Sequence, residues 1–93
     1  MPYENFANSI LQLASHGVPV DLFSLFSDRF LAEYTCFPAL EDLLSGLRIH
    51  SFHDLFSTPP DEADPFVRQN TEFNTYEEML NTACDYFIVH NIV

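Results

Sequence analysis

The chain contains no lysine and no tryptophan, and it has only three arginines among its 93 residues. Proteins that bind DNA or RNA directly use Lys and Arg to neutralise phosphates, so this scarcity argues against direct contact with nucleic acid. It also disfavours recruitment to an anionic membrane surface. Against the three arginines stand 14 Asp and Glu residues, which give a formal net charge of −11. A partner that complements this charge is a basic protein.

Long hydrophobic runs are also missing. No apolar stretch approaches the roughly 20 residues that cross a bilayer, and the N-terminus lacks the basic segment of a secretory signal. We therefore expect a cytoplasmic protein, either in a bacterium or in an infected host cell. The two cysteines, Cys36 and Cys84, are expected as reduced thiols. Neither an internal repeat nor a low-complexity tract is expected.

Hydrophobic residues nevertheless make up 47% of the chain and include 10 Phe. Acidic segments that stay disordered are poor in aromatic residues, so we expect one folded domain, residues 1–93. The predicted class is all-α, a small bundle of four to five helices with a long Pro-rich acidic loop before the last helix. Residues 1–57 are the expected helical core, 58–74 the loop and 75–93 the C-terminal helix.

Apolar residues at helical spacing predict helices over 3–16, 21–34, 38–46 and 51–56. In the last of these, Ser51 is the expected N-cap. The helix over 21–34 is apolar over more than half of its circumference, which predicts that it is central or shared with a partner.

The predicted loop contains three prolines and three acids between residues 57 and 65. After it, Thr75-x-x-Glu78 is a capping box, which predicts the start of the last helix. The tail over 86–93 is rich in β-branched and aromatic residues, which leaves a short C-terminal strand as the alternative to helix.

No constellation indicates catalysis. His50, His53, Cys36 and Cys84 are conceivable zinc ligands, but the cysteines do not form the closely spaced pair that is typical of zinc sites. A Cys–His nucleophile is disfavoured because neighbouring acids raise the pKa of a thiol. We expect a non-enzymatic protein with no metal and no cofactor.

The acids are concentrated from Glu33 onward, and Glu77, Asn81 and Asp85 form one line on the predicted last helix. Carboxylates one helical turn apart are about 5–6 Å from each other, a spacing comparable to that of DNA phosphates. The predicted partner-binding residues are the acids Asp61, Glu62, Asp64, Glu72, Glu77, Glu78 and Asp85, with Phe66 and Tyr86 as aromatic anchors.

These features predict a small acidic binding protein that blocks the basic, nucleic-acid-binding surface of a partner, as DNA-mimic inhibitors do. Small phage proteins that antagonise restriction or CRISPR complexes share this size and charge, although no motif carries the likeness. The alternative is a self-associating structural or adaptor protein. It would form a homodimer through the helix over 21–34, and its charge would only provide solubility.

Overall fold

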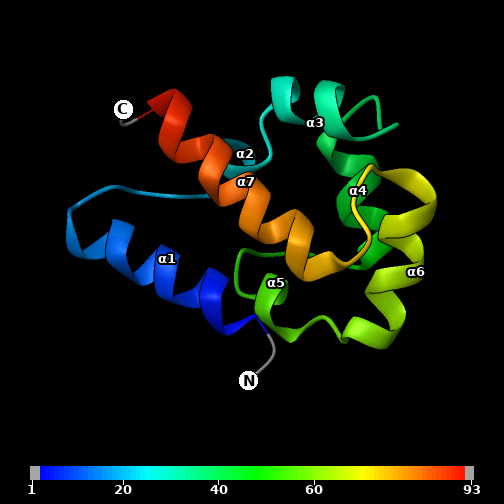
Figure 1. Ribbon diagram of the computed structural model, residues 1–93, viewed down its shortest axis with the longest axis horizontal. Coiled ribbons are helices and arrows are strands. Elements are labelled where there is room, and N and C mark those ends of the chain that lie inside the picture. The colour runs from blue at the N-terminus through cyan, green and yellow to red at the C-terminus, as the bar shows by residue number, and fades with distance from the viewer. Residues whose placement is uncertain (1–2, 92–93) are drawn as a thin grey trace.

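The computed structural model describes residues 3–91, and within that range the predicted all-α class is confirmed (Figure 1). The expected four to five helices are too few, because the described residues form seven. They are α1 (Glu4–Ser15), α2 (Leu22–Leu25), α3 (Asp28–Tyr34), α4 (Leu40–Leu47), α5 (Asp54–Ser57), α6 (Pro60–Asn70) and α7 (Tyr76–Asn91).

The core is built around α7, which packs against α1, α2 and α6. Figure 1 shows α7 crossing the molecule beside α1, with α2 behind it and α6 at its N-terminal end. Its buried side chains are Tyr76, Met79, Leu80, Ala83, Cys84 and Phe87. Helix α7 therefore joins α1, α2 and α6 into one core, and α4 is attached through its contact with α6.

The loop predicted over 58–74 is wrong, since most of it is helix α6. Pro60 occupies the first helical position, where the missing N–H of proline costs no hydrogen bond. Pro65 lies inside the helix and does remove one. Ala63 and Val67 lie one turn apart and are both fully buried. Their burial against the core, which the proline pattern does not reveal, offsets the lost bond.

The single helix predicted over 21–34 is also wrong. Helix α2 ends at Leu25 and α3 begins at Asp28. The backbone N–H of Phe30 donates to the side-chain oxygen of Ser27 at 3.3 Å, so this serine caps a new helix within the apolar stretch. The break lets the chain turn between two buried stretches that one straight helix would hold in line.

Helix α4 runs from Leu40 to Leu47 and not over 38–46. Gly46 lies inside the helix, and Arg48 ends it in the left-handed conformation with φ 59°. Glycine adopts this conformation without strain, whereas a residue with a Cβ pays about 1–2 kcal/mol. The expected end of the helix was therefore close, but the residue that ends it is not the glycine.

The short helix α5 begins three residues after Ser51, which does not cap it. Instead, the carboxylate of Asp54 accepts hydrogen bonds from the backbone N–H groups of His50 (2.8 Å) and Ser51 (3.2 Å). The aspartate thus holds the turn that precedes its own helix.

The predicted N-terminus of the last helix is confirmed. The backbone N–H of Glu78 donates to the hydroxyl oxygen of Thr75 at 3.1 Å. Helix α7 continues to Asn91, so the strand alternative over 86–93 is wrong for residues 86–91. Residues 92–93 lie outside the described range.

The expectation of no internal repeat is corrected by the structure. Residues 28–44 and 64–80 align without a gap, and both form a helix, a Thr-x-Phe turn and a second helix. The identical pairs are Asp28 and Asp64, Phe30 and Phe66, Thr35 and Thr71, Phe37 and Phe73, Glu41 and Glu77, and Leu44 and Leu80. We call these segments the two half-units.

Each half-unit makes the same turn. The hydroxyl of Thr35 donates to the carbonyl of Leu31 at 2.8 Å and accepts from the N–H of Phe37 at 3.2 Å. In the second half-unit, the hydroxyl of Thr71 donates to Val67 at 2.7 Å and accepts from Phe73 at 3.0 Å. Threonine recurs at this position because one hydroxyl can donate to a carbonyl in the last turn of a helix and accept from the amide two residues further on.

The two turns also pair with each other. Thr35 and Thr71 form an isolated antiparallel bridge. The N–H of Cys36 donates to the carbonyl of Asn70 at 3.0 Å, and the N–H of Glu72 donates to the carbonyl of Tyr34 at 2.9 Å. Exchanging the half-units maps one bond onto the other, so they are related by an approximate two-fold axis through this bridge.

Candidate functional site

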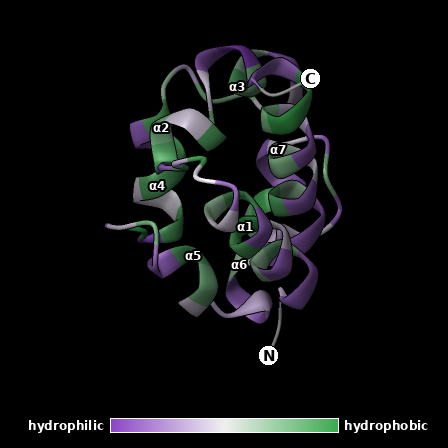
Figure 2. Cartoon of the chain, turned by 90° about the vertical axis from the view of Figure 1, so that its left-hand side faces the viewer, coloured by the Kyte–Doolittle hydropathy of each residue, from purple (hydrophilic) through white to green (hydrophobic). Residues whose placement is uncertain are grey.

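Five of the predicted acids gather at the N-termini of α6 and α7. Asp61, Glu62, Glu77 and Glu78 occupy the first turns of these helices and are exposed. Asp64 connects the helices, because its carboxylate accepts a hydrogen bond from the backbone N–H of Tyr76 at 2.8 Å. We call these five residues the acidic end. Figure 2 shows hydrophilic stretches on α6, close to where the chain begins, and along α7.

Two tyrosines are buried beneath the acidic end. The rings of Tyr3 and Tyr76 pack edge to face with centroids 5.0 Å apart. Their hydroxyls donate to the backbone carbonyls of Thr58 (2.5 Å) and Leu55 (2.9 Å). Burial raises the pKa of Tyr3 to about 12, and the negative charges of Asp64 and Glu77 add to the shift. Burial likewise raises the pKa of Tyr76. Both hydroxyls are therefore held in the neutral form.

The remaining two predicted acids lie elsewhere. Glu72 shares a shallow hollow with Glu33, and Asp85 shares another with Glu33 and Tyr86. The predicted set is thus divided between two places. Glu33 was not predicted as a site residue, because it is distant in sequence from both acids and only the pairing of the two turns brings it near Glu72.

The two predicted aromatic anchors have different surroundings. Tyr86 is half-buried and packs edge to face on Phe30, and its buried hydroxyl has no hydrogen-bond partner among the described residues. Phe66 is also half-buried, but its only aromatic contact within the described range is Phe37, with centroids 5.5 Å apart and a 19° angle between the rings. Tyr86 is therefore part of the aromatic core, whereas Phe66 borders open space.

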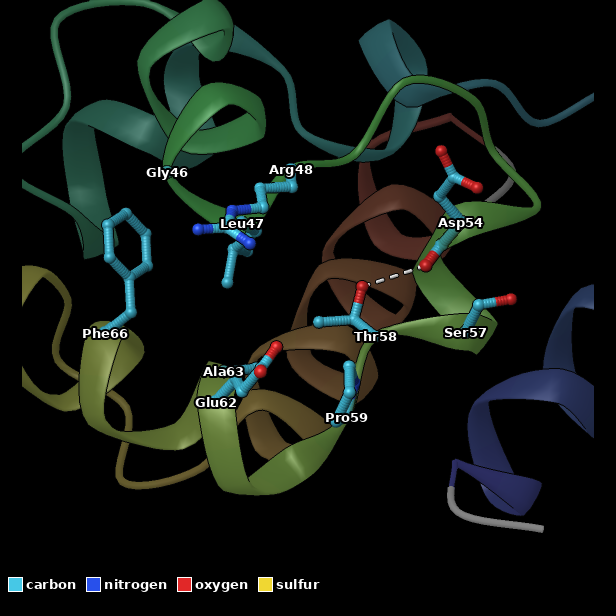
Figure 3. Close-up of a pocket in the computed structure, with 10 residues that line it drawn as sticks. All are labelled: Gly46, Leu47, Arg48, Asp54, Ser57, Thr58, Pro59, Glu62, Ala63 and Phe66. Atoms are coloured by element: carbon cyan, nitrogen blue, oxygen red, sulfur yellow. Dashed lines mark hydrogen bonds between the residues drawn. The ribbon is translucent and has the colours of Figure 1, made fainter.

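That open space is a cavity of about 550 Å³ between α4 and α6, closed on a third side by α5 and residues 58–59. We call it the α4–α6 cavity. Its walls are formed by Gly46, Leu47, Arg48, Asp54, Ser57, Thr58, Pro59, Glu62, Ala63 and Phe66 (Figure 3). The figure shows the Phe66 ring beside Gly46 and the Glu62 carboxylate directed toward the space between α4 and α6.

The position of the Phe66 ring depends on Gly46. A Cβ atom at residue 46 would overlap the ring, so only glycine lets Phe66 lie directly on the backbone of α4. Sequence reasoning named Phe66 but missed Gly46 and the cavity. The alignment of Phe66 with Phe30 was an available signal, since it marks a ring that needs a flat surface to pack on.

The cysteines and histidines do not assemble a site. Cys84 is buried, which raises the pKa of its thiol, and the Cys36 thiol lies 3.6 Å from the side-chain oxygen of Asn70. Within residues 3–91, no group of three or more His, Cys, Asp or Glu side chains is arranged to hold a metal ion.

The fold defines the class: within the described residues the chain is a small all-α domain with an open cavity beside α4 and α6. Comparisons with protein-family models, with curated proteins and with solved structures find no match to this chain. Across residues 3–91, no helix has the length and apolar character needed to cross a membrane.

Proposed function

We propose that this chain is an acidic binding protein that covers a basic, nucleic-acid-binding surface of a partner protein. Its activity is stoichiometric obstruction and not catalysis. The acidic end makes the contact, and nucleic acid competes with the chain for the same basic surface.

The observation that carries this proposal is the rigid placement of the acids on α6 and α7. Side chains on a helix hold fixed spacings, whereas acids on an extended loop would lose more conformational entropy on binding. The hydrogen bond from Tyr76 to Asp64 links the two helices, so their first turns present carboxylates together. With a net charge of −11 and no lysine, the chain attracts basic surfaces over long range.

The test compares two variants with equal charge. The first, which removes acids from the acidic end, is Asp61→Asn, Glu62→Gln, Glu77→Gln and Glu78→Gln. The matched control also removes four acids from first turns of helices elsewhere: Glu4→Gln, Asp28→Asn, Glu41→Gln and Asp42→Asn. Both variants have a net charge of −7, and both lose favourable charge–dipole contacts at helix N-termini.

The probe is a nuclease-treated pool of proteins that bind to heparin, passed over each immobilised variant. We expect the native chain and the control to retain proteins that a short DNA duplex or high salt releases, and we expect the acidic-end variant to retain far less. Equal retention by the two variants, or retention that neither salt nor DNA reverses, contradicts the proposal.

Self-association is the second candidate, favoured by three exposed apolar side chains. Leu11, Phe23 and Val89 are 66%, 74% and 58% exposed, and they lie on three helices that pack together, α1, α2 and α7. The helical segment first considered for a dimer contributes only Phe23, because its other large apolar residues are buried or half-buried within the chain. Light scattering tests this candidate: a concentration-dependent dimer that Phe23→Ser abolishes supports it, and a monomer at all concentrations rules it out.

A further inference from the structure

We propose that the α4–α6 cavity is a pocket for a planar cation, the guanidinium group of an arginine on a partner polypeptide. The proposal rests on the function proposed above, because it names the anchor of the same basic partner. Three properties of the cavity carry it: an aromatic wall, Phe66, that packs on one ring where its counterpart Phe30 packs on four, a carboxylate on the same cavity, and that counterpart, which shows what shape of group packs on the ring.

The first half-unit shows what packs on this phenylalanine when the space is filled. Phe30, the counterpart of Phe66, is fully buried among four rings: Phe26, Tyr34, Phe73 and Tyr86. Its contact with Phe73 is stacked, with centroids 6.0 Å apart and an 11° angle between the rings. The corresponding stacked contact in the second half-unit is the one between Phe66 and Phe37.

None of the other three rings has a Phe or Tyr at the position 36 residues away. The positions that align with Phe26, Tyr34 and Tyr86 are Glu62, Asn70 and His50. Moreover, α4 ends at Leu47, whereas α7 continues to Asn91 and thereby carries Tyr86 over Phe30. The α4–α6 cavity is therefore the place where Phe66 lacks the planar side chains that surround Phe30.

The charge of the cavity walls favours a positively charged planar group over a neutral one. Glu62 is exposed and lines the same cavity as Phe66, whereas the Asp54 carboxylate is held by the amides of His50 and Ser51. A neutral ring placed here would desolvate the Glu62 carboxylate without replacing its hydrogen bonds with water. A guanidinium group is planar, stacks on an aromatic face and donates paired hydrogen bonds to a carboxylate.

Among residues 3–91, Arg48 is the only cation on the cavity walls, and it repels a second one. It is exposed and stands at the C-terminus of α4, where helix carbonyls favour a positive charge. Removal of Arg48 therefore distinguishes a positively charged occupant from a negatively charged one. A cationic occupant binds no more weakly when Arg48 is removed, whereas an anionic occupant would lose its partner.

The probes are the capped tripeptide Gly-Arg-Gly and its analogue with citrulline, which has the same shape but no charge. Nuclear magnetic resonance titration of the full chain measures binding and maps it. We expect the arginine peptide to shift the signals of Gly46 and Phe66 in a saturable way and to bind about tenfold more tightly than the citrulline peptide. Equal binding of the two peptides, or shifts spread over the acids elsewhere, overturns the proposal.

Three variants complete the test. Glu62→Gln is expected to weaken binding of the arginine peptide about tenfold, whereas Glu41→Gln, an exposed acid on α4 outside the cavity, leaves it unchanged. Arg48→Gly leaves it unchanged or tightens it. An equal effect of Glu62→Gln and Glu41→Gln, or weaker binding by Arg48→Gly, overturns the assignment.

The two proposals fail separately. Arginine-peptide binding at Gly46 and Phe66 with no retention of the heparin-binding pool leaves the pocket in place and removes the proposed function. Retention of that pool by the acidic end, without any peptide signal at the cavity, supports the proposed function and removes the pocket.

Discussion

At the scale of single residues, the close approach of Gly46 and Phe66 sets the shape of the α4–α6 cavity. A glycine inside a helix ordinarily destabilises it by about 1 kcal/mol relative to alanine. Here the missing Cβ is what lets the aromatic ring lie on the helix backbone. Helix propensity alone therefore predicts that Gly46→Ala stabilises the protein, whereas packing against the Phe66 ring predicts that it destabilises it.

We predict that Gly46→Ala destabilises the fold by about 1–3 kcal/mol, because the new methyl group overlaps the Phe66 ring. Urea denaturation monitored by circular dichroism measures the change. In the background of Phe66→Ala the same substitution becomes stabilising, since the overlap is gone and the better helix propensity of alanine remains. Stabilisation by Gly46→Ala alone would show that the ring does not lie on the glycine.

The buried phenol of Tyr3 makes the stability of the fold depend on alkaline pH. Its folded pKa is raised from 10 to about 12, so the folded state favours the neutral phenol more than the unfolded chain does. The resulting stability is fully present below pH 10 and is lost as the pH rises toward 12. We expect the free energy of unfolding to fall across this window, and to fall less steeply in Tyr3→Phe. An equal slope in both proteins would exclude Tyr3 as a source of the alkaline instability.

At the scale of elements, α6 forms against its own local sequence. It contains two prolines and three of the chain's 14 acidic residues. Its stability comes from burial of Ala63 and Val67 and from the hydrogen bond between Asp64 and the first residue of α7. Helices held by tertiary contacts and not by propensity are common among short elements. Substitutions of the two prolines measure how much the local sequence costs, because Pro65 removes a helix hydrogen bond and Pro60 does not.

We predict that Pro65→Ala stabilises the protein by about 1 kcal/mol or more. It restores a backbone hydrogen bond inside α6, although part of the gain is offset by the greater freedom of the unfolded chain. Pro60→Ala is the matched control at the first helical position and should be neutral or slightly destabilising. Thermal unfolding of the two variants measures the difference, and equal effects would contradict the placement of Pro65 within the helix.

At the scale of the whole molecule, a net charge of −11 is confined to a globule whose Cα radius of gyration is 12.3 Å. Like charges at such separations repel each other, and salt screens them because the Debye length falls to about 10 Å at 0.1 M ionic strength. The charge that attracts a basic partner therefore also weakens the fold.

We accordingly predict that the melting temperature rises as sodium chloride is added from low ionic strength. The rise should be smaller in the acidic-end variant, whose net charge is −7, because fewer repulsions remain to be screened. Scanning calorimetry across a salt series measures both slopes. A melting temperature that is independent of salt would show that self-repulsion does not limit stability.

The sequence by itself determined the all-α class, the start of the last helix and the excess of negative charge. These follow from local properties: apolar spacing, a Thr-x-x-Glu capping box and composition. It did not predict α6 or the break between α2 and α3, because burial of Ala63 and capping by Ser27 outweigh the local signals of proline and apolar spacing.

Only the tertiary structure decided which acids stand together and where a pocket opens. Glu33 lies near Glu72 because the two threonine turns, 36 residues apart in the sequence, pair with each other. The acids of α6 lie near those of α7 because Asp64 accepts a hydrogen bond from the first residue of α7. The cavity stays open because α4 ends at Leu47 and carries no ring over Phe66, whereas the longer α7 carries Tyr86 over Phe30. Each of these outcomes depends on contacts between residues far apart in the chain, which spacing along the sequence does not specify.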